Sequence, residues 1–146
     1  DQAENYMVIS VLRDPVDRQK SFFYFYGKWK GQGKTLTLNH YKQWAPNGYF
    51  KGEPNSAIKQ TDFLKLGDKY IGNFWLYEDL NHKLTELMNF LRIEIKHPLP
   101  SHKSNFRRVR ENEVTFDSEI MDKMLEVFGP DFEMYNELVG KSDVGY

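Results

Sequence analysis

An α/β fold with parallel strands flanked by helices is predicted from the alternation of apolar runs and helical patterns along the chain. Residues 6–12 (YMVISVL) form a continuous apolar, β-rich run, which is typical of a strand buried on both faces. Residues 70–76 (YIGNFWL) form a second run of the same kind. Helical spacing then follows in the apolar residues Leu80, Leu84, Leu87, Met88 and Leu91.

The first strand is expected to lead directly into a helix over about residues 15–26. Asp14 suits the N-cap position, because its short carboxylate can accept a free backbone N–H, and Pro15 suits the first helical position. Asp17 lies in the first turn, where the helix dipole favours an acid. Gly27 is the expected end of this helix.

The remaining elements follow from turn residues and apolar spacing. Residues 27–56 are rich in glycine and lysine and are predicted to be mostly loop. The apolar stripes at 84–91 and 120–128 are expected to be core. The expected helices cover residues 38–44, 56–66, 80–92, 117–128 and 131–138, with a break at Gly129-Pro130.

Composition limits the classes of protein to consider. The 146 residues suit a single domain over 1–146, and 40% hydrophobic with 28% charged residues is an ordinary globular balance. A net charge of −1 argues against a general nucleic-acid binder. The sequence has no cysteine and no closely spaced histidines, which gives a metal site little support. No apolar run reaches the roughly 20 residues that span a bilayer. The compartment stays open between cytoplasm and Golgi lumen.

Arg13 stands where the first strand ends and the first helix begins. Open α/β sheets bind ligands at this edge, and helix N-termini favour phosphate. Arg18 and Ser21 are three residues apart and therefore share a helix face, which can join Arg13 in holding a phosphate. The alternative is an Asp14–Arg18 surface ion pair with a solvent-facing serine, and the residues alone leave both readings open.

One run of residues resembles a known motif, namely Leu12-Arg13-Asp14-Pro15-Val16-x-Arg18-x-x-Ser21. It is similar to the 3′-phosphate-binding motif of PAPS-dependent sulfotransferases, in particular of the carbohydrate branch that includes heparan and uronyl 2-O-sulfotransferases. Segments resembling later parts of that family follow in order at 58–64, 71–80, 102–107 and 131–135. The resemblance implies that Arg13 and Ser21 hold the 3′-phosphate of the donor.

The resemblance also implies a fold and an activity. The fold would be a partial P-loop-like parallel sheet flanked by helices. The activity would be transfer of a sulfuryl group from PAPS to a hydroxyl, expected to be that of a carbohydrate, leaving PAP as product and using no metal. Further donor contacts are implied for Arg18, Lys103, Ser104 and Arg107, although an ordinary charged loop would also account for the last three.

The family's second phosphate loop, which cradles the 5′-phosphosulfate, has no counterpart before Tyr6. The chain is therefore expected to be the C-terminal portion of such an enzyme. A missing N-terminal segment or a companion chain would supply the remaining parts, and the catalytic residues stay unknown. Glu78 and Asp79 are interpreted as helix caps rather than as a pair of catalytic carboxylates.

Lys28, Lys30 and Lys34, interleaved with Trp29, are candidates for contact with an anionic sugar, while a solvated loop is the equal alternative. The same stretch resembles a Walker A loop, but it has one residue too many between its first glycine and Gly-Lys-Thr. Two competing functions remain. One is a non-catalytic module with a degenerate sulfotransferase fold that binds nucleotide or anionic glycan, and the other is a different phosphate-handling enzyme such as a nucleotide kinase.

Overall fold

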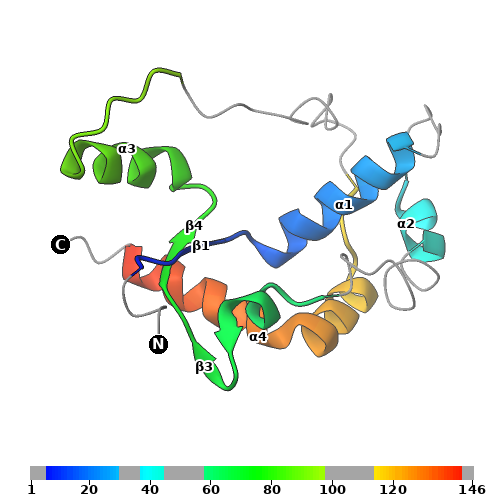
Figure 1. Cartoon of the computed structure of the whole chain (residues 1–146). Helices are drawn as coiled ribbons and strands as arrows, with labels where there is room; N and C mark the ends of the chain where they lie inside the picture. Colours follow the sequence, from blue (N-terminus) through cyan, green and yellow to red (C-terminus); the bar gives the residue numbers. More distant parts are fainter. Residues whose placement is uncertain (1–5, 30–36, 45–57, 98–113, 143–146) are drawn as a thin grey trace.

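The computed structural model describes residues 6–29, 37–44, 58–97 and 114–142, and the fold is given for these residues. They form a mixed α/β arrangement in which a small parallel sheet packs against helices (Figure 1), so the predicted class is confirmed at this level. In chain order the elements are β1 (Ile9–Leu12), α1 (Pro15–Trp29), α2 (Leu38–Trp44), the 3₁₀ helix η3 (Gln60–Leu64), β2 (Lys65–Leu66), β3 (Lys69–Tyr70), β4 (Asn73–Leu76), α3 (Leu80–Phe90) and α4 (Ser118–Ser142).

The two strands predicted from apolar runs are neighbours. β1 and β4 pair in parallel, in a register that sets Ile9 opposite Asn73 and Leu12 opposite Leu76. The prediction that the first strand is buried on both faces is wrong, because only Leu12 is fully buried and Val11 is 38% exposed. The sheet has two strands within the described residues, which leaves β1 too little cover for full burial.

The helix predicted over residues 56–66 is wrong. One turn of 3₁₀ helix, η3, is followed there by the two-residue strands β2 and β3, which form an antiparallel hairpin. Gly67 in the connecting turn has a φ of 63°, a left-handed conformation that glycine adopts without strain. The turn residues therefore outweigh the short helical pattern before them.

α1 begins as predicted but continues further. Asp14 Oδ1 accepts the backbone N–H of Asp17 at 2.7 Å, which is the expected N-cap hydrogen bond. The predicted end at Gly27 is wrong, since the helix runs on to Trp29. A glycine inside a helix costs only about 1 kcal/mol relative to alanine, so packing of the helix can override it.

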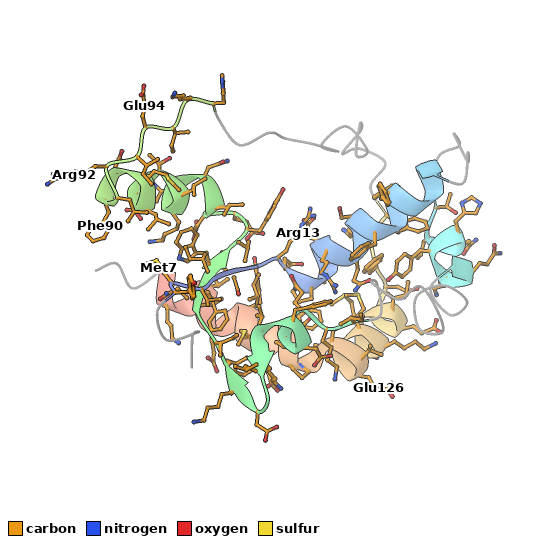
Figure 2. All side chains as sticks on the ribbon, viewed as in Figure 1. Met7, Arg13, Phe90, Arg92, Glu94 and Glu126 are labelled. Atoms are coloured by element: carbon orange, nitrogen blue, oxygen red, sulfur yellow. The ribbon has the colours of Figure 1, made fainter. Side chains whose placement is uncertain are left out.

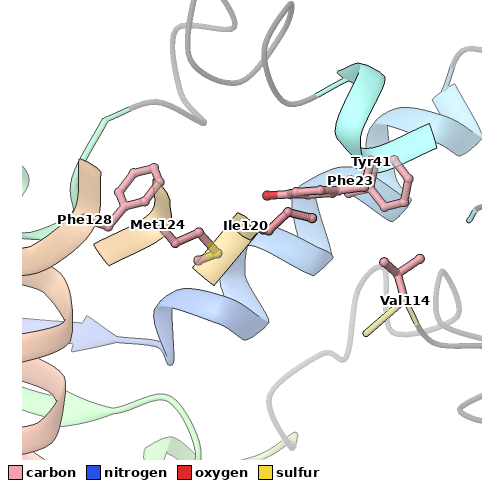
Figure 3. Close-up of a cluster of buried hydrophobic side chains, with 6 residues drawn as sticks. All are labelled: Phe23, Tyr41, Val114, Ile120, Met124 and Phe128. Carbon is pink, nitrogen blue, oxygen red and sulfur yellow. The ribbon is translucent and has the colours of Figure 1, made fainter. Parts of the chain in front are cut away.

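The main hydrophobic core lies where α1, α2 and α4 meet (Figure 3). The predicted core stripe on residues 120–128 is confirmed, because Ile120, Met124 and Phe128 are all buried. From α1 and α2 the core receives Phe23 and Tyr41, whose rings meet edge to face with centroids 5.2 Å apart. The predicted break before Gly129-Pro130 is present as a kink, since Phe128 leaves helical geometry within α4.

α3 stands apart from this core (Figure 1). Its C-terminus is closed by two hydrogen bonds, from the N–H of Ile93 to the carbonyl of Met88 and from the N–H of Arg92 to that of Asn89. The prediction that the stripe over 84–91 belongs to the core is wrong, because α3 contains no buried residue. An apolar stripe is a local pattern, whereas burial needs a partner surface, and the described residues cover this stripe only partly.

Candidate functional site

Arg13 lies at the carboxyl edge of the β1–β4 sheet. Because the two strands are parallel, both end at this edge, and the N–H of Tyr77 donates to the carbonyl of Leu12 at 2.7 Å just beyond the last strand pair. The guanidinium of Arg13 lies over the ring of Tyr77, 4.8 Å from its centroid. Figure 2 shows Arg13 at the junction of β1 and α1, as the sequence predicts.

The backbone of Arg13 is held by a residue that is distant in sequence. The side-chain amide of Gln60 accepts the N–H of Arg13 at 3.0 Å and donates to its carbonyl at 2.8 Å. This pair of bonds imitates the pairing of one further β-strand residue at the edge of β1. It fixes the peptide from which the Arg13 side chain projects.

Gln60 is in turn fixed by Asp131 in α4. The carboxylate of Asp131 is fully buried and accepts the backbone N–H of Gln60 at 2.7 Å. It also accepts both the N–H and the hydroxyl of Thr61, at 2.9 and 2.8 Å. Three donors thus satisfy one buried carboxylate, and the network connects α4 through η3 to Arg13.

The roles of Gln60, Thr61 and Asp131 were not predicted from the sequence. The sequence carries a weak signal for them: a polar Gln-Thr pair just before an apolar stretch, and an acid directly after a proline. Nothing in these patterns indicates that the three residues meet, because the segments are about 70 residues apart.

The side chain of Arg13 is not free. Its Nε and Nη2 atoms both contact Oδ2 of Asp17, one turn along α1, and both side chains remain partly exposed at 25% and 33%. Within the described part of the chain, no hydrogen bond is present at Nη1. Arg13 therefore presents the edge of its guanidinium formed by Nε and Nη2 to Asp17.

The start of α1 differs from a simple phosphate-binding helix N-terminus. The carboxylate of Asp14 already occupies the position of an anion there, since it accepts the N–H of Asp17. The remaining cationic and hydroxyl groups lie further along the helix, where Arg18 and Ser21 are partly buried and share a face by their spacing. The guanidinium of Arg18 lies over the ring of Phe22, 5.1 Å from its centroid. An anion bound by this element would thus lie beside α1 rather than on its axis.

Carboxylates gather at the same edge of the sheet. Burial, followed by the negative charges of Glu78, Asp14, Asp17 and Asp79, raises the pKa of Tyr135 in α4. Carboxylates that follow β1, lie in α1 and follow β4 therefore all raise the pKa of the same phenol. The cap interpretation fails for Asp79, which precedes α3 but makes no side-chain capping hydrogen bond.

Several predicted contacts fall outside the residues that the structure describes. They are Lys30, Lys34, Lys103, Ser104 and Arg107. The backbone of Lys28 lies in α1, but its side chain is not described. In the described ranges, no group of three or more His, Asp or Glu side chains is placed to hold a metal ion. The helices in those ranges are too short or too polar to cross a membrane.

Comparison with known proteins finds no match to a family model, to a curated protein or to a solved structure. The functional assignment consequently depends on the residues and geometry of the chain itself.

Proposed function

We propose that this chain is the donor-binding part of a PAPS-dependent sulfotransferase that transfers a sulfuryl group to a hydroxyl, expected to belong to a carbohydrate. The observation that carries the proposal is the fixed position of Arg13 at the carboxyl edge of a parallel sheet, directly before a capped helix. Ligands of open α/β folds bind at such edges. The sequence motif around Arg13 and Ser21 gives the ligand its expected identity.

The described residues have suitable chemistry for a 3′-phosphate. Arg13 offers its remaining guanidinium edge, and Arg18 and Ser21 add a charge and a hydroxyl on the neighbouring face of α1. Guanidinium groups bind phosphate through planar, charge-assisted hydrogen bonds. These residues would position the donor, and no catalytic residue is assigned among them.

Binding of PAP tests the proposal directly. We expect PAP to raise the thermal midpoint of the protein, because a ligand that binds only the folded state stabilises it. Arg13→Ala should abolish this shift. Arg92→Ala, which removes an exposed arginine at the end of α3, should leave the shift unchanged and serves as the control. An equal shift in wild type and Arg13→Ala would refute the proposal.

A second candidate is a non-catalytic module with a degenerate sulfotransferase fold that binds nucleotide or anionic glycan. It is favoured by the contact of Arg13 with Asp17 and by the carboxylate of Asp14 at the helix start, which both weaken an anion site. Incubation of the protein with labelled PAPS and mixed glycan acceptors separates the two candidates. Transfer of the label to a glycan would exclude the non-catalytic module.

A further inference from the structure

The contact between Arg13 and Asp17 raises a question about the proposed phosphate site. Asp17 Oδ2 accepts from two nitrogens of the guanidinium, and the Tyr77 ring packs against the same group. Such a carboxylate can help binding by orienting the arginine, or it can hinder binding by repelling a second anion. The two effects have opposite signs, so their sizes decide which one dominates.

The orienting effect is small. Ion pairs between partly exposed residues at i and i+4 change an equilibrium only about twofold. Tyr77 also holds the guanidinium independently, and Gln60 holds its backbone. Loss of Asp17 would therefore leave Arg13 near its present position.

The repulsive effect is larger. Two like unit charges about 5 Å apart in water weaken a binding equilibrium about fourfold. A dianionic phosphate beside a carboxylate doubles this repulsion energy, so the equilibrium is weakened roughly tenfold or more. The dielectric constant of water gives a lower limit for this repulsion, because the two side chains are only 25% and 33% exposed. Asp14, Glu78 and Asp79 add to the negative charge at this edge of the sheet, since together with Asp17 they act on Tyr135.

We propose that Asp17 is a specificity-determining residue of this site: its carboxylate holds Arg13 when no ligand is bound and lowers the affinity for a dianionic phosphate. The inference rests on the proposed function, since it assumes that Arg13 binds the 3′-phosphate. It adds that the site is built for ready release of the nucleotide rather than for the tightest binding.

Isothermal titration with PAP tests this role in Asp17→Asn and Asp17→Ala. Asn removes the charge but keeps an oxygen that can accept from Arg13, whereas Ala removes both. We expect Asp17→Asn to bind PAP about fivefold to tenfold more tightly than wild type, and Asp17→Ala to lie within about twofold of Asp17→Asn.

Two controls isolate the effect. Asp68→Asn makes the same change of net charge at the exposed turn between β2 and β3 and should leave the affinity for PAP unchanged. Adenosine 5′-phosphate lacks the 3′-phosphate, so Asp17→Asn should bind it as wild type does. Circular dichroism of each variant checks that the fold is retained.

The outcomes separate this inference from the proposed function. Unchanged or weaker binding of PAP by Asp17→Asn, with binding that still depends on Arg13, would overturn the role of Asp17 and leave the proposed function standing. Binding that does not depend on Arg13, or no binding by any variant, would overturn both. Tighter binding that is lost in the Arg13→Ala, Asp17→Asn double variant would support both.

Discussion

Replacing Asp131 by asparagine is predicted to destabilise the protein by about 2–3 kcal/mol, although the change is a single atom in size. The carboxylate accepts three hydrogen bonds, from the N–H of Gln60 and from the N–H and hydroxyl of Thr61. The amide oxygen of asparagine can replace the acceptor that serves Thr61. Its NH₂ group would then face the N–H of Gln60, so that two donors oppose each other in a fully buried site.

The magnitude follows from this geometry. One hydrogen bond to a charged acceptor is lost, which is worth about 1.5–3 kcal/mol, and one buried donor is left unsatisfied. Asp131→Ala leaves all three donors without an acceptor and is expected to cost about 4 kcal/mol or more. Because small domains have total stabilities of roughly 5–15 kcal/mol, the alanine variant is expected to lose at least about a quarter of the total stability.

Urea unfolding followed by circular dichroism measures the effect, with the midpoint and slope fitted separately. Thr61→Val removes only the hydroxyl bond and should cost about 1 kcal/mol. Asp122→Asn, an exposed position on α4, should stay within about 0.5 kcal/mol of wild type. If Asp131→Asn were as stable as Asp122→Asn, the network that connects α4 to the Arg13 peptide would be refuted.

Two further predictions concern other parts of the fold. Within the described part of the chain, neither amide atom of the fully buried Gln19 has a hydrogen-bond partner. Gln19→Met should therefore raise the free energy of unfolding, measured in urea, by about 1–2 kcal/mol. A lower free energy of unfolding would show that the amide is paired. Lys42 donates to Asp117 at 2.6 Å and to Glu119 at 3.0 Å, and these hydrogen bonds raise its pKa and lower the pKa of both carboxyls. Since the folded-state pKa of each carboxyl lies below its unfolded value, their stabilisation is fully present above the unfolded pKa and is lost as the pH falls through the lower, folded pKa. The contribution of Lys42, whose pKa is raised, is lost only as the pH rises through its folded value. Lys42→Met should therefore have a lower thermal midpoint than wild type near pH 7 and the same midpoint near pH 2, whereas a constant difference across this range would contradict the assignment.

Some local signals in the sequence predicted the structure correctly. Asp14 and Pro15 placed the start of α1 correctly, because an N-cap acts on backbone groups only three residues away. The helix over 38–44 was also predicted, and so was the core face of residues 120–128, since helical spacing of apolar residues is a local property. The sequence likewise placed Arg13 at the junction of strand and helix.

Predictions that needed knowledge of neighbours were wrong. The stripe on α3 has the spacing of a core helix but is only partly covered by the described residues, and Val11 is exposed in a two-stranded sheet. Burial depends on which surfaces meet, and the spacing of residues in one segment carries no information about a partner. For the same reason, neither the pairing of Arg13 with Asp17 nor the pKa shift of Tyr135 was anticipated.

By itself, therefore, the sequence determined the mixed α/β class, the capped start of α1 and the place of Arg13 along the chain. The tertiary structure decided how Arg13 is held. Gln60 lies 47 residues from Arg13, and Asp131 lies 71 residues from Gln60, yet their hydrogen bonds join in one network at the carboxyl edge of the sheet. Side chains so far apart in sequence meet only when the strands and helices pack, because no local preference of the backbone connects them.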